Sequence, residues 1–349
     1  MKHHELSPSS FGRFDRCPGS VALGAHAPSV PAGAGAERGT RIHAAALLNE
    51  GYDQLDDFDR RFADQYRAFV QEGHRAIADV HGDLVERLTE ERLVIYGTGN
   101  QFVTFGTADE IHVYQDRVMI YDLKTHPTGE LPEHLTTCQG IVYAVGALQR
   151  WTGTDRVTFI AYAPAGDSEF VFELHRADLA QYEEWITRTA QNVRDAHDVP
   201  TKQELFDLLN PGTEQCKFCP AASICPKIQE IAMEVAEVKD TAGIPGVVQA
   251  DGELQVVDHQ EFAQFYAKIE LAGRAVDAAK RGMKELLHGI ESEYLELKTR
   301  KGRVTFTDVP KNKSALPGGV SRTISPDDFQ QAITVSVSKL RKQGNRSEP

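Results

Sequence analysis

The chain has 349 residues, of which 41% are hydrophobic and 26% are charged, a balance typical of a globular protein with one large domain or two. No apolar run is long enough to span a membrane and no signal-peptide pattern opens the chain, so we expect an intracellular, cytoplasmic protein. The formal net charge of −13 argues against a broadly basic nucleic-acid coat, but it leaves room for a local groove that binds phosphates.

Capping residues and hydrophobic spacing predict a mainly helical N-terminal part. Ser7 is expected to cap a helix that has Pro8 in its first turn, and Cys17-Pro18 ends that helix. Residues 26–35 are rich in Ala, Pro and Gly and are expected to form a loop. The helices predicted in this part cover residues 8–16, 37–50 and 56–78.

Both strands and helices are expected in the rest of the chain. A short strand over 92–96 leads into a strand, a turn, a second strand and a helix within residues 106–143. The elements predicted after it are paired strands over 155–162 and 169–174, a helix over 178–195, a cysteine-bearing loop over 210–226, a connector over 231–253, a long amphipathic helix over 262–290, a hairpin around Lys301-Gly302 and a last helix from Pro326.

The hairpin within 106–143 carries polar residues in a pattern that suits a metal site. Residues 118–124 alternate, so Asp122 and Lys124 project to one face of the strand. A turn at Gln115-Asp116 or at Asp116-Arg117 would place Asp109 opposite Asp122 or Lys124. Two adjacent carboxylates are costly unless a cation joins them, and oxygen ligands suit Mg²⁺ or Mn²⁺. The alternative is an exposed hairpin with a surface Asp–Lys pair.

A helix motif follows the hairpin, because Gln139 and Tyr143 are four residues apart and share one helix face. The order of a G-x-x-D strand, a D-x-K strand and a Q-x-x-x-Y helix resembles the PD-(D/E)XK nuclease superfamily, and within it the RecB-like branch. This resemblance implies an α/β fold with a restriction-endonuclease-like core, in which helices flank a mixed central sheet.

The same resemblance extends to Gly39-Thr40-x-x-His43, which is similar to a G-T-x-x-H helix motif whose histidine is a metal ligand. Without the resemblance, a histidine satisfied by a local hydrogen bond would be the simpler interpretation. The chain departs from the motif at Leu47, where many relatives have a glutamate; the nearest acid is Glu50. A second departure is His126, which follows D-L-K-T where glycine is common.

Five cysteines in an intracellular chain are not expected to form disulfides. Cys216, Cys219 and Cys225 have the spacing C-x2-C-x5-C and need a fourth ligand, for which Cys17 is the best candidate. Cys138 lies in the Q-x-x-x-Y helix and is more simply a small buried hydrophobic residue. The spacing alone is compatible with zinc, with an iron–sulfur cluster or with unpaired thiols.

The N-terminal sequence S-P-S-S-F-x-x-F-x-x-C-P, at residues 7–18, resembles the motif of iron–sulfur nucleases. These include AddB-type helicase-nuclease subunits and CRISPR-associated adaptation nucleases. The resemblance implies that Cys17, Cys216, Cys219 and Cys225 hold a [4Fe-4S] cluster, whose first role would be to staple the first helix to the last loop of the domain.

The resemblance therefore implies a Mg²⁺- or Mn²⁺-dependent DNA exonuclease or end-processing nuclease. Lys124 would orient the attacking water or offset transition-state charge, and Gln139 and Tyr143 would position the DNA backbone or the Lys124–Asp122 pair. A stand-alone nuclease of this size suits phage or mobile-element recombination on linear DNA ends, with a single-strand annealing protein as a partner and oligomers as an option. The expected metal ligands are His43, Asp109, Asp122 and the backbone carbonyl of Leu123.

Three other functions stay open at this point. The first is a nuclease that trims DNA for CRISPR adaptation, and the second is a non-catalytic iron–sulfur or zinc DNA-binding module. The third is a structural protein that assembles through its long helix.

The expected domains are a nuclease domain over 1–230, a connector over 231–260 and a C-terminal helical and hairpin region over 261–349. The C-terminal region is the most basic part of the chain. A solvated face is the default interpretation, and a DNA-guiding or oligomerising surface is the sharper one. Its candidate DNA-binding residues are Lys280, Arg281, Lys284, Arg300, Lys301 and Arg303.

Overall fold

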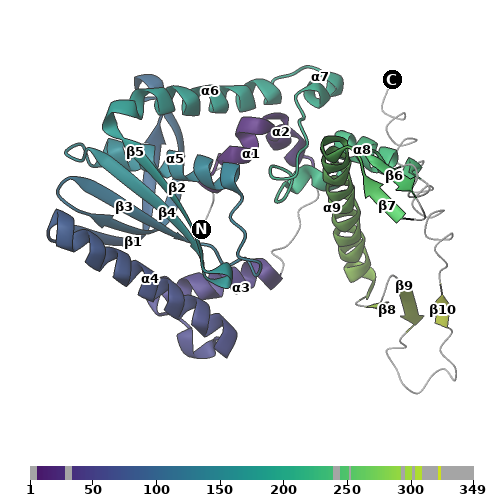
Figure 1. The fold of residues 1–349 in the computed structure, drawn as a ribbon, viewed down its shortest axis with the longest axis horizontal. Coiled ribbons are helices and arrows are strands. Elements are labelled where there is room, and N and C mark those ends of the chain that lie inside the picture. Colours follow the sequence, from purple (N-terminus) through teal and green to yellow (C-terminus); the bar gives the residue numbers. More distant parts are fainter. Residues whose placement is uncertain are drawn as a thin grey trace. The chain divides into compact units, whose positions relative to one another are not determined.

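The computed structural model describes residues 6–27, 34–238, 244–250, 253–291, 295–300, 303–308 and 321–323. Internal contacts divide the chain into two compact units, Met1–Ala278 and Ala279–Pro349 (Figure 1). This division falls inside the long helix α9 (His259–Glu291), whereas the sequence places the domain boundary within 231–260. No helix of the described residues combines the length and the apolar character that crossing a membrane requires.

The first unit is built on a mixed five-stranded sheet in the order β1-β2-β3-β4-β5 (Figure 1). All neighbouring strands are antiparallel except β3 and β4, which are parallel because α5 (Glu133–Arg150) connects them. The predicted α/β architecture is confirmed at this level. The strands are β1 (Glu86–Tyr96), β2 (Phe102–Val113), β3 (Arg117–Leu123), β4 (Arg156–Ala163) and β5 (Ser168–His175).

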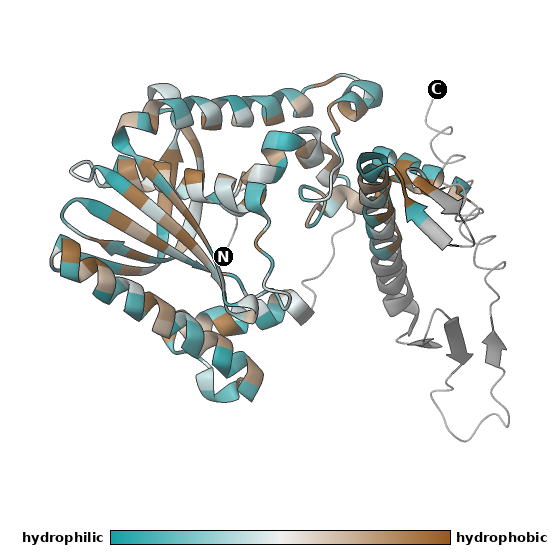
Figure 2. Ribbon diagram, in the orientation of Figure 1, coloured by the Kyte–Doolittle hydropathy of each residue, from teal (hydrophilic) through white to brown (hydrophobic). Residues whose placement is uncertain are grey.

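Two hydrophobic clusters cover the two faces of this sheet. Because side chains alternate along a strand, Val118 and Ile120 of β3 belong to one cluster, while Met119 and Tyr121 belong to the other. The first cluster contains residues of α1 (Phe11–Arg16), α5 and α6 (Leu179–His197). The second contains residues of α3 (Ala34–His43) and α4 (Asp57–His81), and Figure 2 shows hydrophobic residues concentrated on the strands between these layers.

The hairpin between β2 and β3 has the first of the two predicted registers. Val113 pairs with Val118, and the Tyr114 N–H donates to the Arg117 carbonyl at 2.8 Å. The turn therefore consists of Gln115-Asp116. The paired residues continue to Glu110 and Tyr121, so the next position along each strand sets Asp109 opposite Asp122.

Several helices agree with the sequence prediction, and others differ from it. The predicted helix over 8–16 forms as a 3₁₀ turn (Pro8–Ser10) followed by α1, although the Ser7 side chain makes no capping hydrogen bond. The predicted helix over 37–50 becomes α3 and then a π-helical turn (Ala44–Leu48). The structure adds two short helices that the hydrophobic spacing does not reveal, α2 (Gly19–Gly24) and α7 (Lys202–Asp207).

The prediction of a connector over 231–253 is wrong at both ends of this range, where the structure has a helix and two strands. The helix α8 (Pro226–Glu237) enters it, because Pro226 starts a helix directly after Cys225 and Ile228 is fully buried beside the cysteines. A short hairpin of β6 (Val247–Ala250) and β7 (Glu253–Val256) then follows.

The second unit contains a small antiparallel sheet in the order β10-β9-β8. Its strands β8 (Leu295–Arg300) and β9 (Arg303–Asp308) confirm the predicted hairpin, and β10 (Ser321–Thr323) joins β9. Of the basic residues expected to bind DNA, Lys280, Arg281 and Lys284 lie on α9, and Arg300 pairs with Arg303 across the hairpin. Lys301 and the helix predicted from Pro326 lie outside the described residues.

Candidate metal centre

Two buried carboxylates lie side by side at the end of the hairpin. Asp109 of β2 is 9% exposed and Asp122 of β3 is 6% exposed. Asp109 Oδ2 accepts a hydrogen bond from the Leu123 N–H at 2.7 Å, which sets the backbone of Leu123 against the carboxylate pair. The predicted pairing of two acids on neighbouring strands is therefore present.

Gln139 joins Asp122 to Lys124. Its Nε2 donates to Asp122 Oδ1 at 2.8 Å, and its Oε1 accepts from Lys124 Nζ at 2.8 Å. Lys124 Nζ also lies 2.6 Å from Asp122 Oδ2 in an ion pair. The amide of Gln139 can satisfy both partners because it is a donor and an acceptor. The D-x-K strand and the Q-x-x-x-Y helix thus form one polar network.

His43 reaches this network from the other layer. It is the last residue of α3, where the helix widens into the π-helical turn, and its Nδ1 lies 3.4 Å from Asp109 Oδ2. The preceding Gly39 allows α3 to approach the strand end, because a Cβ there would lie 2.9 Å from Thr125 Oγ1. Single π-helical turns within helices are often found at functional sites.

A third carboxylate, that of Glu90, lies at the site and was not predicted from the sequence. It lies in β1 between Thr89, which pairs with Glu110, and Glu91, which pairs with Ala108, so the register sets Glu90 opposite Asp109. Its φ of 53° is in the left-handed region, which is strained for a residue other than glycine. This position brings Glu90 together with His43 and Asp109, and the ligand atoms of the three residues all lie within 4.8 Å of one another.

The third acid of the site comes from β1 and not from the helical segment that carries His43. In that segment Leu47, four residues after His43, packs against the second hydrophobic cluster. A weak signal existed in the sequence, because two adjacent glutamates, Glu90 and Glu91, interrupt the alternation expected of a strand.

Tyr143 links the helix that carries Gln139 to β2. Its hydroxyl donates to the Thr107 carbonyl at 2.7 Å, and its ring stacks on Phe159. Gly106 makes this possible, since a Cβ there would lie 2.9 Å from the Tyr143 ring and 2.5 Å from Pro8. Tyr143 therefore anchors α5 to β2, close enough to Asp122 and Asp109 for their charges to act on its hydroxyl.

The ionisable groups of the site shift one another's pKa values. Burial raises the pKa of Asp122, an effect that Lys124 opposes and Asp109 reinforces. Burial alone would lower the pKa of His43, but the carboxylates of Asp109 and Asp122 outweigh it and the pKa is raised. Burial, with Asp109 nearby, also raises the pKa of Glu90. An added cation would relieve this crowding of acids.

Four cysteines form a second group, distant in sequence from one another. Cys17, Cys216 and Cys225 are buried in one hydrophobic cluster, against which Cys219 packs. Backbone N–H groups approach two of the sulfurs: Asn210 donates to Cys17 Sγ at 3.3 Å and Gly212 donates to Cys216 Sγ at 3.4 Å. The structure thus brings the end of α1 against the loop before α8, as expected for these four residues.

Comparison with known proteins gives two results. A solved structure titled "Crystal structure of SSO0001" has 17% sequence identity to this chain over 65% of this chain and 88% of that chain, with a TM-score of 0.31. The family described as "Protein of unknown function (DUF2800)" matches residues 52–316. This match includes Glu90, Asp109, Asp122, Lys124 and Gln139 and covers most of the sequence. The chain belongs to the DUF2800 family.

Proposed function

We propose that this protein is a metal-dependent DNA nuclease of the RecB-like PD-(D/E)XK type, which acts as an exonuclease on DNA ends. The observation that carries the proposal is the convergence of Asp109, Asp122 and Lys124 on two neighbouring interior strands of a mixed sheet, with His43 and Glu90 beside them. If Asp122 and Lys124 formed only a surface ion pair, nothing would require His43 and Glu90, from two other elements, to lie beside them.

The carboxylates fit Mg²⁺ or Mn²⁺, both of which prefer oxygen ligands, and a directly bound imidazole would suit Mn²⁺ better than Mg²⁺. Asp122 Oδ2 is buried and has an ion pair but no well-aligned hydrogen bond. The hydroxyl of Tyr66 is also buried near these acids and has no hydrogen-bond partner within the described part of the chain. Asp109 and Asp122 would hold the metal, with His43 and Glu90 as further ligands or as acceptors for its waters.

When bound, such a metal supplies Lewis-acid activation of water and offsets the charge on a scissile phosphate. The protein's own groups do the rest. Lys124 is 28% exposed and can reach a water or a phosphate oxygen in front of the site. Gln139 accepts from the ammonium group of Lys124 and donates to Asp122, which helps to position both groups. Tyr143 keeps Gln139 in place by anchoring α5.

We propose that the cysteine group holds a [4Fe-4S] cluster rather than a single zinc ion. Zinc at about 2.3 Å from each sulfur would hold the thiolates within about 4 Å of one another. Among the described residues, no three of the cysteines have sulfurs within 4.8 Å of each other. A cubane spreads its thiolates over four irons, and N–H···S hydrogen bonds like those to Cys17 and Cys216 are typical of such sites.

The test is cleavage of linear double-stranded and single-stranded DNA with Mg²⁺ or Mn²⁺ by anaerobically purified full-length protein. We expect Asp109→Asn and Lys124→Ala to reduce cleavage at least about 100-fold, because each removes several kcal/mol of charge stabilisation. The matched control is Asp116→Asn, in the turn of the same hairpin, which should cut like the wild type.

Two outcomes would overturn the proposal. Equal cleavage by wild type, Asp109→Asn and Lys124→Ala would make the site assignment wrong. DNA binding without cleavage over both metals would favour a non-catalytic DNA-binding module. An exonuclease, in addition, should leave circular DNA uncut while it degrades the linear form.

A further inference from the structure

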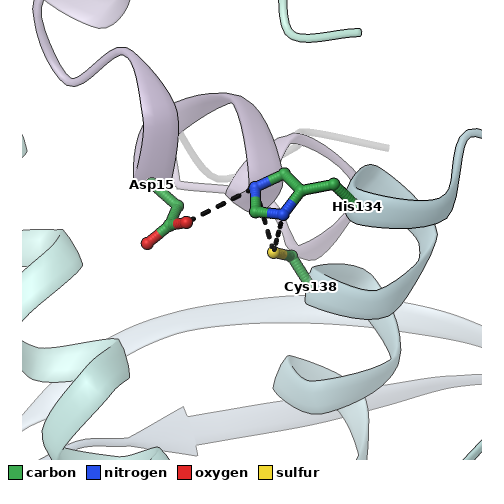
Figure 3. A group of neighbouring side chains, drawn as sticks. All are labelled: Asp15, His134 and Cys138. Carbon is green, nitrogen blue, oxygen red and sulfur yellow. Dashed lines mark hydrogen bonds and ion pairs between the residues drawn. The ribbon is translucent and has the colours of Figure 1, made fainter.

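A third group of ligand-type side chains lies between α1 and α5, apart from the two already described. Asp15 comes from α1, and His134 and Cys138 lie one turn apart on α5 (Figure 3). Their ligand atoms all lie within 4.8 Å of one another. Cys138 is 3% exposed, while the side chains of His134 and Asp15 are 22% and 28% exposed, so ions can reach the group from solvent.

The three side chains converge on one nitrogen. His134 Nε2 lies 3.4 Å from Asp15 Oδ2 and 3.6 Å from Cys138 Sγ. Tetrahedral zinc, with Zn–S of about 2.3 Å and Zn–N and Zn–O of about 2.0 Å, sets an N···O distance of about 3.3 Å and an N···S distance of about 3.5 Å between its ligands. The two distances from His134 Nε2 match the corresponding edges of such a tetrahedron, and Asp15 and Cys138 lie within 4.8 Å of each other.

Hydrogen bonding explains these contacts less well. The Gly12 carbonyl also lies 3.2 Å from His134 Nε2, so a carboxylate, a carbonyl and a sulfur all face a nitrogen that carries one proton at most. A relay of Cys, His and Asp would use both ring nitrogens, one for each partner. Here the acid and the closer sulfur contact share Nε2 (Figure 3).

The surroundings hold the group in place. Trp185 Nε1 donates to Asp15 Oδ1 at 2.9 Å, which turns the other carboxylate oxygen toward His134. Gly12 lets the two helices approach closely, since a Cβ there would lie 2.9 Å from Leu135 Cα and 3.3 Å from Cys138 Cβ. Hydrogen bonds that orient a ligating carboxylate are a usual feature of built metal sites.

We propose that Asp15, His134 and Cys138 form a zinc site that ties α1 to α5, with water or the Gly12 carbonyl in the fourth position. The set of one thiolate, one imidazole and one carboxylate suits Zn²⁺ and is poor for Mg²⁺. Burial raises the pKa of Cys138 to about 12, so zinc displaces a proton from this thiol when it binds. The site would brace α5, which carries Gln139, against α1, which Cys17 directly follows.

The experiment measures zinc, iron and sulfide per chain after dialysis of the anaerobic full-length protein against Zn²⁺ alone. We expect His134→Ala and Cys138→Ala each to contain one zinc fewer than the wild type, with iron and sulfide unchanged. The matched control is His175→Ala, which removes a histidine that pairs with Glu173 but has no thiol nearby, and it should keep the full zinc content. Zinc should also raise the melting temperature of the wild type and the control, but not of His134→Ala.

Asp15→Asn provides a variant that should fold even if the α5 variants do not, because its amide oxygen can still accept from Trp185. It should bind zinc at least about tenfold more weakly, since it loses the charged ligand. Equal zinc content in the wild type and in all folded variants would overturn the proposal and leave an Asp–His–Cys group held by hydrogen bonds. Because the readout is metal content, its failure would not affect the proposed nuclease activity, and loss of nuclease activity would not affect it.

Discussion

Replacement of Gln139 by methionine tests whether the polar network of Asp122, Lys124 and Gln139 is needed for DNA cleavage. The substitution keeps the volume of the side chain but removes the donor to Asp122 and the acceptor from Lys124, both at 2.8 Å. A hydrogen bond to a charged group contributes about 1.5–3 kcal/mol. Water can replace the bond to the partly exposed Lys124, so we expect the free energy of unfolding to fall by about 2–3 kcal/mol.

The effect on catalysis should be separable from that loss of stability. Without Gln139, Lys124 keeps its ion pair with Asp122 but loses the second contact that fixes the position of its ammonium group, and we expect Gln139→Met to reduce DNA cleavage at least about tenfold under conditions where it stays folded. The assays are urea unfolding without added metal and cleavage of linear DNA with Mn²⁺.

Gln149 provides the matched control on the same helix. It donates to the Tyr96 carbonyl and to Glu183, and it accepts from the Tyr96 N–H, so Gln149→Met also removes a half-buried amide network. This variant should lose stability but keep cleavage. Unchanged cleavage in Gln139→Met, or an equal loss of cleavage in both variants, would refute the reasoning.

Three further predictions concern the other groups. Glu90→Gln should weaken Mn²⁺ binding about tenfold or more in a calorimetric titration, whereas its neighbour Glu91→Gln, which loses only the surface pair with Arg150, should bind like the wild type. Because the pKa of His43 is raised and a ligating imidazole must be neutral, Mn²⁺ affinity should increase as pH rises through that pKa, and His43→Ala should remove this step; an unchanged pH profile would exclude His43 as a ligand. Anaerobic wild type and Cys138→Ala should both be brown with broad visible absorbance, while Cys17→Ser should be colourless and melt at a lower temperature; equal iron in Cys17→Ser would count against the cluster.

The carboxylate pair could be predicted from the sequence because its determinants are local. Alternation fixes the side of the strand to which Asp122 and Lys124 project, and the register follows from a two-residue turn at Gln115-Asp116. Gln139 could be singled out because it shares a helix face with Tyr143 directly after the hairpin, and α5 packs on the sheet because it connects the parallel strands β3 and β4.

Glu90 could not be predicted because its position depends on a local backbone distortion and not on a pattern. Alternation assumes an extended backbone at every residue of a strand, and β1 departs from it where Glu90 takes a positive φ. The group of Asp15, His134 and Cys138 was missed for a different reason. Cys138 looks like a small core residue in isolation, and only the packing of α1 on α5 shows that an acid faces it.

The most direct test of the account is Asp122→Asn. Because burial raises the pKa of Asp122, the ionised carboxylate costs stability without metal, and this cost grows as pH rises from the unfolded pKa through the raised folded one. We predict that Asp122→Asn melts no lower than the wild type at neutral pH without metal, yet loses Mn²⁺-dependent cleavage of linear DNA at least about 100-fold. Cleavage at the wild-type rate by this variant would contradict the account.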